Sequence, residues 1–380
     1  MSLPTVITDA PPSAAAAAPG SLRPIALWLL FCAAMIFVMV VIGGITRLTL
    51  SGLSITEWQP VAGILPPMSP AAWAVEFAKY QHIPQYRLLN WGMSLDDFKT
   101  IYLWEYVHRL WGRLIGVAYG LPFLYFALRR RLPRPLIAPL AGILALGFLQ
   151  GALGWYMVTS GLAARVEVSQ YRLVAHLALA LLIYAATLWV ALELLQSRSP
   201  ASREREGPAP QAWEGEGASS RWRRAAEALI GLVALTMLAG GFTAGLHAGL
   251  VYNTFPLMDG SFVPAGYVQL HPFIRNWFEN IPAVQFDHRL LAETTVAAVL
   301  LLWLAGRRAA LPRPARLALH ALLAAALLQF SLGVATLLLV VPIPLAAAHQ
   351  AAGLLLLTAA IVLRHRLRRP EMDLALAAAL

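Results

Sequence analysis

The sequence predicts an all-α polytopic membrane protein with eight transmembrane helices, arranged as two tandem pseudo-symmetric four-helix bundles. The chain of 380 residues is 59% hydrophobic and only 13% charged, about half the charged fraction of a soluble domain. Apolar stretches of about 20 residues, long enough to cross a bilayer as helices, recur along the chain. In addition, motifs of the first half reappear in the second half at nearly constant spacing. These three observations together define the fold class.

The apolar stretches give the bounds of the eight spans. A bilayer offers the backbone no water to bond, so each span is expected to be a helix that satisfies its own hydrogen bonds. In chain order, the predicted spans cover residues 25–45, 105–128, 136–158, 172–195, 225–246, 287–305, 315–341 and 345–364.

Arginines cluster in alternate connections between the spans. The positive-inside rule places these connections and both termini in the cytoplasm, and the long loops 46–104 and 247–286 on the outer side of a cell (inner) membrane. The net charge of +10 is then explained by topology in a lipid bilayer, and no nucleic acid partner is expected. The clusters are Arg129, Arg130, Arg131 and Arg134, six arginines in 196–224, four in 307–316, and Arg364, Arg366, Arg368 and Arg369.

The same pattern divides the chain into five segments. The first residues are rich in Ala and Pro and lack the basic start of a signal peptide, while the central linker is rich in Ser, Pro, Gly and charge. Two short helices, at 71–80 and 94–100, are expected at the outer membrane surface. The segments are a disordered cytoplasmic tail (1–23), an N-terminal four-helix bundle (24–196), a cytoplasmic linker (197–223), a C-terminal four-helix bundle (224–366) and a cytoplasmic tail (367–380).

Four histidines occupy matched positions in the two halves. Residues 43–53, GGITRLTLSGL, reappear as GGFTAGLHAGL at 240–250, and His108-Arg109-Leu110 reappears as His288-Arg289-Leu290. His176 and His349 likewise correspond to each other. Each histidine is expected about one turn into its helix, near the outer face, so each half presents two imidazoles at one level.

Two imidazoles facing each other in a four-helix bundle can ligate a haem iron from both sides. Arg109, Arg289 and Arg47 are placed to meet the haem propionates by charge-assisted bonds. Zinc would require three or four ligands, and no cysteine or carboxylate cluster supplies them. A single histidine in a membrane helix is more often a packing residue, but four at matched positions favour ligation.

Glu105 breaks the symmetry of the two halves. It precedes His108 by three residues and therefore shares its helix face, whereas Gln285 stands at the matching position of the second half. An ionisable residue at membrane depth marks a candidate functional site. A structural Glu105–Arg109 pair is the alternative interpretation. The asymmetry favours a reactive site in the first half and a stable electron-transfer haem in the second.

Several separated blocks resemble the haem A synthase family, in its cysteine-poor bacterial and mitochondrial branch, from about residue 28 to 364. The glutamate–histidine–arginine signature of that family is present as Glu105, His108 and Arg109. The blocks are GGITRLTLSGLSITEWQPVAGILPP (43–67), QYRLLNWGMSLDDFKTIYLWEYVHRLWGRLIG (85–116), LQGALGWYMVTSGL (149–162), AGLHAGLVYNTFPLMDG (244–260) and QFDHRLLAE (285–293).

The resemblance implies an oxidoreductase that converts the C8 methyl group of haem O to a formyl group, giving haem A for terminal oxidases. It implies that His288 and His349 ligate a resident haem b, and that His108 and His176 receive the substrate haem with catalytic Glu105 beside it. It also implies haem O synthase, cytochrome oxidase assembly factors and a quinone or other membrane redox carrier as partners. The paired outer cysteines of other branches are missing, and His247 departs from the pattern.

Two other functions fit parts of the pattern. A di-haem b-type membrane electron carrier, working as a quinone oxidoreductase without haem modification, would use the same four histidines. A transporter would also explain a duplication, but this repeat is parallel and midplane polar residues are scarce. Glu105 in only one half favours the enzyme.

Overall fold

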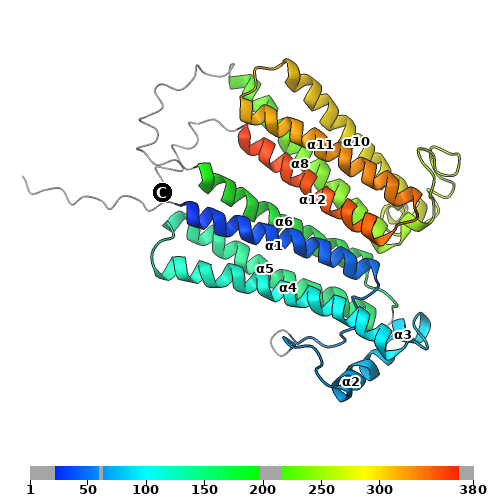
Figure 1. Ribbon diagram of the computed structural model, residues 1–380. Coiled ribbons are helices and arrows are strands. Elements are labelled where there is room, and N and C mark those ends of the chain that lie inside the picture. Colours follow the sequence, from blue (N-terminus) through cyan, green and yellow to red (C-terminus); the bar gives the residue numbers. More distant parts are fainter. Residues whose placement is uncertain (1–21, 60–62, 164, 197–215, 368–380) are drawn as a thin grey trace, which may run out of the picture.

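The computed structural model describes residues 22–59, 63–163, 165–196 and 216–367, so both predicted tails and most of the predicted linker lie outside the described residues. Within these ranges, eight helices are long and apolar enough to cross a membrane, which confirms the predicted all-α polytopic class (Figure 1). They are α1 (Arg23–Leu48), α4 (Leu95–Leu128), α5 (Arg134–Ala163), α6 (Gln170–Gln196), α8 (Glu216–Gly245), α10 (Ile281–Arg308), α11 (Arg313–Leu338) and α12 (Ile343–Arg366).

Short helices occupy the connections at one end of the molecule. α2 (Pro70–Gln81) confirms the helix predicted at 71–80, and α3 (Pro84–Leu88) follows it. In the second half, α9 (Asn276–Glu279) precedes α10, with 3₁₀ turns at Ala248–Leu250 and Phe273–Arg275. Figure 1 shows α2, α3 and the loop before α10 at the same end of the helices.

Each half closes into a ring of four helices. α1 and α5 each contact both α4 and α6, and in the second half α8 and α11 each contact both α10 and α12. The two rings meet along α1, α6, α8 and α12, as Figure 1 shows. These contacts are the ones expected for two tandem four-helix bundles.

Small residues bring the two rings close together. A Cβ atom on Gly44 of α1 would overlap the side chain of Gln350 on α12, and a Cβ on Gly241 of α8 would lie 3.2 Å from Leu177 on α6. Gln350 also donates a hydrogen bond to the carbonyl of Val40 (2.9 Å). These glycines are the second members of the repeated Gly-Gly pairs, so they permit the close helix approach expected of small residues in membranes.

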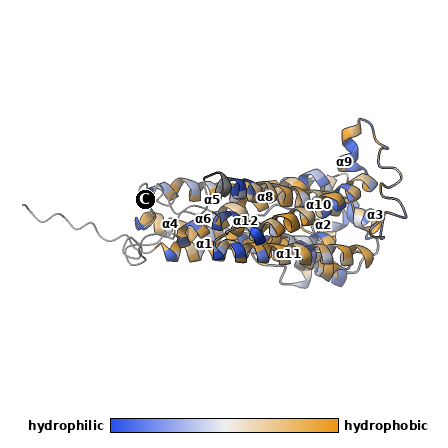
Figure 2. Ribbon diagram, turned by 90° about the horizontal axis from the view of Figure 1, so that it is seen from above, coloured by the Kyte–Doolittle hydropathy of each residue, from blue (hydrophilic) through white to orange (hydrophobic). Residues whose placement is uncertain are grey.

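The main apolar core fills the end of the molecule opposite α2 and α3. Leu29, Cys32, Ala191 and Leu354 are almost fully buried there, between α1, α6 and α12. Cys32 is a buried free thiol. Figure 2 shows apolar residues along most of the helix length. Tight packing of this core fills the space between the helices at this end. The matched histidines lie outside the core, along a cavity.

One predicted element was wrong. Residues 94–100 do not form a separate surface helix but the first turns of α4, which begins ten residues before the predicted span. Ser94 caps the helix by accepting the backbone N–H of Asp97. Phe98, fully buried, packs with Tyr80 of α2 and Tyr102. The aromatic cluster therefore stabilises an extension that hydropathy alone did not predict.

α8 also begins earlier than predicted. Its first residue is Glu216, so the last residues of the predicted linker 197–223 are helical rather than irregular. Trp222 of this first part is partly buried and packs against the apolar core. Burial of that face against the core accounts for the longer helix, because packing of an apolar face contributes more to a helix than propensity does.

Candidate functional site

The four matched histidines all line one cavity of about 1380 Å³ that extends through both halves. His176, His288 and His349 lie about two turns from the start of α6, α10 and α12, whereas His108 lies about three and a half turns into α4. The expected depth of one turn in each helix was therefore wrong, most of all for His108, because α4 starts early.

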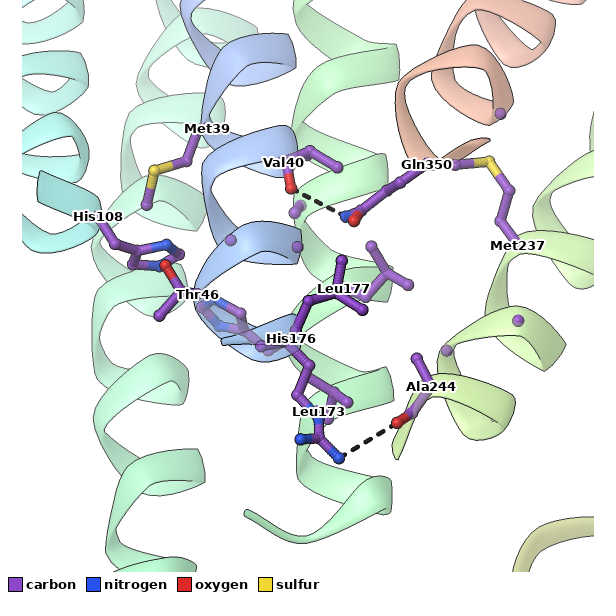
Figure 3. A pocket seen from close by; sticks show the side chains of 18 of the residues that line it. Met39, Val40, Thr46, His108, Leu173, His176, Leu177, Met237, Ala244 and Gln350 are labelled. Carbon is purple, nitrogen blue, oxygen red and sulfur yellow. Dashed lines mark hydrogen bonds between the residues drawn. The ribbon is translucent and has the colours of Figure 1, made fainter. Parts of the chain in front are cut away.

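The histidines pair within each half. His108 and His176 extend from α4 and α6 of the first half, His288 and His349 extend from α10 and α12 of the second half, and all four line the cavity. Figure 3 shows the side chains of His108 and His176 projecting into the cavity from α4 and α6. The structure thus brings together the pairs that the repeat predicted.

Each histidine lies against a glycine of the neighbouring helix. An added Cβ on any of the four glycines would come within 2.8 to 3.0 Å of the imidazole Cε1, closer than ordinary van der Waals contact. The glycines are therefore required for the imidazoles to pack edge-on against the helix backbone. The pairs are Gly43 with His108, Gly154 with His176, Gly240 with His288, and Gly333 with His349.

The imidazoles differ in how they are held. In the second half, Nδ1 of His288 donates to the carbonyl of Thr236 (3.1 Å), and Nδ1 of His349 donates to the carbonyl of Gln329 (3.2 Å). A carbonyl only accepts, so these bonds place the proton on Nδ1 and leave the lone pair on Nε2, the nitrogen that could ligate iron. In both halves a glutamine amide lies at Nε2 of the second histidine, Gln329 at His349 (3.4 Å) and Gln150 at His176 (3.2 Å). Within the described residues, Nδ1 of His108 and of His176 is buried without a hydrogen-bond partner.

Glu105 is buried, with 3% of its surface exposed, and lines the cavity one turn from His108. Its carboxylate accepts hydrogen bonds from Ser54 Oγ (2.7 Å) and the Ile55 backbone N–H (2.8 Å). Arg109 donates to it from Nε (3.1 Å) and Nη2 (2.6 Å). The predicted Glu105–Arg109 pair is therefore formed, and these four hydrogen bonds fix the position of the carboxylate beside His108.

Arg109 and Arg289 hold the loops that follow α1 and α8 in the same way. Arg109 donates to the carbonyls of Ile55 and Glu57, both at 2.8 Å. Arg289 donates to the carbonyls at the matching positions in the repeat, which belong to Tyr252 and Thr254. Both arginines line the cavity, so they fix its rim whether or not they also meet propionates.

Gln285 takes the place of Glu105 in the second half. It is 2% exposed, and its Nε2 donates to the Tyr252 carbonyl (3.3 Å) while its Oε1 has no hydrogen-bond partner. A neutral amide therefore fits the same position beneath the same loop. The difference between the halves is a fixed negative charge, not a difference in loop architecture.

An ionic cluster that sequence reasoning missed joins the two halves. Glu167, in the connection between α5 and α6, accepts from Arg47 Nη2 (2.7 Å) and contacts His247 Nε2 (2.7 Å). Burial opposes ionisation of Glu167, but the hydrogen bond from His247 and the charge of Arg47 outweigh it and lower its pKa. His247, which departs from the family pattern, therefore contacts a carboxylate of the other half. Glu167 carried no repeat or motif that could have marked it.

His82 and His320 lie outside the cavity. Nδ1 of His82, exposed after α2, donates to the carbonyl of Ala78 (2.7 Å). Nδ1 of His320 accepts from Trp303 Nε1 (2.9 Å). In the described part of the chain, no group of three or more His, Cys, Asp or Glu side chains is arranged to hold a metal ion. The paired imidazoles are thus the metal-binding arrangement that the geometry offers.

Comparisons with a family model and with curated proteins point to the same family. Residues 26–361 match the family described as cytochrome oxidase assembly protein (COX15-CtaA). A heme A synthase of Nitrosospira multiformis is 52% identical over 91% of this chain and 94% of its own. A heme A synthase of Rhodospirillum centenum is 51% identical over 95% and 92% of the two chains. The heme A synthase COX15 of Bos taurus is 45% identical over 91% and 83%.

Proposed function

The chain belongs to the cytochrome oxidase assembly family that includes the haem A synthases, and from this membership we propose how its two histidine pairs divide the work. The protein is an enzyme that makes haem A from haem O. His108 and His176 receive the substrate haem O, and His288 and His349 ligate a resident haem b. The electron-carrier alternative finds no support among the relatives.

The single observation that carries this division is the difference in Nδ1 contacts. Two carbonyls hold His288 and His349 in the ligating tautomer, which suits a haem that stays bound. His108 and His176 lack that restraint among the described residues, which suits a haem that must enter and leave. The edge-on glycines and the apolar cavity fit a flat macrocycle in both halves.

The reaction replaces a methyl group by a formyl group at C8. Two successive hydroxylations, each of which adds one oxygen atom from water and releases two electrons and two protons, convert the methyl to a geminal diol, which loses water to give the aldehyde. A haem b held by His288 and His349 would carry these electrons to a membrane redox carrier of the quinone class. Glu105, held in place by Arg109, Ser54 and Ile55, stabilises the positive charge that develops as the methyl group is oxidised. It also lies where it can accept the released proton.

The proposal includes the cellular setting. The arginine clusters support cytoplasmic termini and haem sites near the outer face of the inner membrane. In that place the enzyme takes haem O from a haem O synthase and passes haem A to oxidase assembly factors. Arg109, Arg289 and Arg47 line the cavity, and Nε of Arg47 and of Arg289 lacks a hydrogen-bond partner. This leaves donors of both residues available to propionates.

Pigment extraction tests the proposed reaction. Cells that make haem O but no haem A are given this protein together with a haem O synthase, and their haems are separated by chromatography. We expect haem A to appear, identified by its formyl absorption and mass. Accumulation of haem O alone, with the protein present in the membrane, would show that the proposed reaction is wrong.

A methyl group added at Gly240 tests the resident site. Its Cβ would lie 2.9 Å from His288 Cε1, so the imidazole must shift away from its position. We expect Gly240→Ala to lower the affinity for resident haem by about tenfold, as other losses of ligand support do. The measurement is haem per protein after purification.

Gly231→Ala is the matched control on the same helix, because a Cβ there meets nothing within 4 Å. It is expected to retain the haem content of the natural protein. Equal haem content in the Gly240 and Gly231 variants would show that the contact between Gly240 and His288 does not support haem binding.

A further inference from the structure

The two halves differ most between their second and third membrane helices. Along one face of α4, glycines recur every four residues, at Gly112, Gly116 and Gly120, and α5 brings Gly147 and Gly151 to the opposite side. All five glycines line the cavity. A Cβ on Gly116, Gly147 or Gly151 would meet nothing within 4 Å. We define the space between these five residues as the α4–α5 groove.

The matching face of the second half carries side chains instead of glycines, although Ala292, Val296, Ala326 and Phe330 also line the cavity. The repeat places larger residues at the five matching positions. Phe330, which corresponds to Gly151 in the repeat, packs against Phe255 with ring centroids 5.9 Å apart. α10 and α11 also pack on each other more extensively than α4 and α5 do. The matching residues are Ala292, Val296 and Leu300 on α10, and Ala326 and Phe330 on α11.

The α4–α5 groove opens onto the lipid-facing surface. Val117, Leu121 and Phe148 line the cavity, yet they are 53%, 63% and 75% exposed. Their counterparts in the second half, Ala297, Leu301 and Leu327, do not line the cavity. The cavity therefore reaches the surface of the first bundle through this face. At the far end, Tyr119 donates a hydrogen bond to the carbonyl of Leu140 (3.0 Å) and closes the groove.

Unpartnered polar atoms at the near end indicate that a ligand belongs there. In the part of the chain that the structure describes, Nδ1 of His108, Nδ1 of His176 and Oε1 of Gln150 are buried without hydrogen-bond partners, and their residues line the same cavity. From His108 to Gly120 the groove follows α4 for about three turns, or about 18 Å. It is a long apolar space that begins at the proposed substrate site.

We infer that the α4–α5 groove binds the hydroxyethylfarnesyl tail of haem O and admits the substrate sideways from the bilayer. This inference rests on the proposed function of the first half. Haem O carries this isoprenoid tail and haem b does not, so only the substrate half needs a groove. Burial of the tail stabilises the complex through its apolar area. The larger residues of the second half narrow the matching space, which favours a tail-less haem.

Leucine in place of Gly116 or Gly147 tests the groove. Each added side chain enters open space, so the fold is expected to persist and the groove to be filled. The full-length protein, purified with its resident haem, is titrated with haem O and with haem b, and binding is followed by difference absorption. Both variants are expected to bind haem O about tenfold more weakly or worse, because the tail loses its buried contacts. Haem b, which lacks the tail, should bind the first half with unchanged affinity.

Gly142→Leu is the matched control. Gly142 lies on α5 in open space but does not line the cavity, so haem O affinity should not change. Retention of the resident haem spectrum shows that a variant is folded, and Gly147→Ala, which adds one methyl group, gives a smaller effect in the same direction.

The outcomes separate the groove from the proposed function. If haem O binds the leucine variants as tightly as it binds the natural protein, the groove does not hold the tail. If haem O binding to the natural protein survives alanine at both His108 and His176, the first half is not the substrate site, and both proposals fail.

Discussion

Glu105→Gln is expected to lower haem A formation by about 100-fold or more while both haems still bind. The substitution replaces the carboxylate of Glu105 by the neutral amide that Gln285 carries at the matching position of the second half. A positioned acid–base or charged group contributes about 10²–10⁴ in rate. Gln285 shows that an amide fits this position beneath the matching loop. The measurement is the initial rate of haem A formation, together with haem O affinity.

The matched control is Gln285→Glu in the second half. It adds a carboxylate beside Arg289, as Glu105 lies beside Arg109, and is expected to leave the substrate site unchanged. Haem A output from Glu105→Gln equal to that of the natural protein would contradict the catalytic role. Loss of haem O affinity without a change in rate would show that Glu105 only supports the Ser54–Ile55 loop.

Much of this site could be predicted from repetition in the sequence. A duplicated unit keeps what both copies need, so matched histidines, glycines and arginines indicated paired sites before any geometry was known. Arg109 and Arg289 bind loop carbonyls at matching positions, which shows that the repeat extends to individual hydrogen bonds. The eight spans were predicted for a similar reason, because a bilayer allows only long apolar helices.

The features that sequence reasoning missed depend on packing between distant segments. The early start of α4 requires Phe98 to meet Tyr80, and hydropathy does not report such contacts. Glu167 becomes important only because the halves bring Arg47 and His247 to it. The different Nδ1 contacts of the histidines depend on which backbone carbonyls of the neighbouring helices lie within reach, and no residue pattern encodes this.

The glycine-to-larger differences between α4 and α10 were visible in the sequence, but their meaning was not. A glycine in a membrane helix usually indicates close helix packing, as at Gly44 and Gly241. Gly116 and Gly147 instead face open space. Only the structure distinguishes a glycine that is covered from one that lines a cavity.

The two histidine pairs are expected to respond oppositely to alanine substitution. His288→Ala or His349→Ala removes an axial ligand of the resident haem, whose bis-imidazole ligation depends on both. Haem content should then fall below about a tenth of the natural value. His108→Ala or His176→Ala should leave the resident haem in place and abolish haem A formation, because the substrate loses its own ligand.

The most direct test is the absorption spectrum of the four alanine variants, purified from cells that make no haem O. The account predicts a low-spin bis-histidine haem b spectrum in the His108 and His176 variants, and its loss in the His288 and His349 variants. Thermal unfolding confirms that each variant is folded. A resident haem that survives in the His288 and His349 variants but disappears from the His108 and His176 variants would reverse the assignment of the two halves.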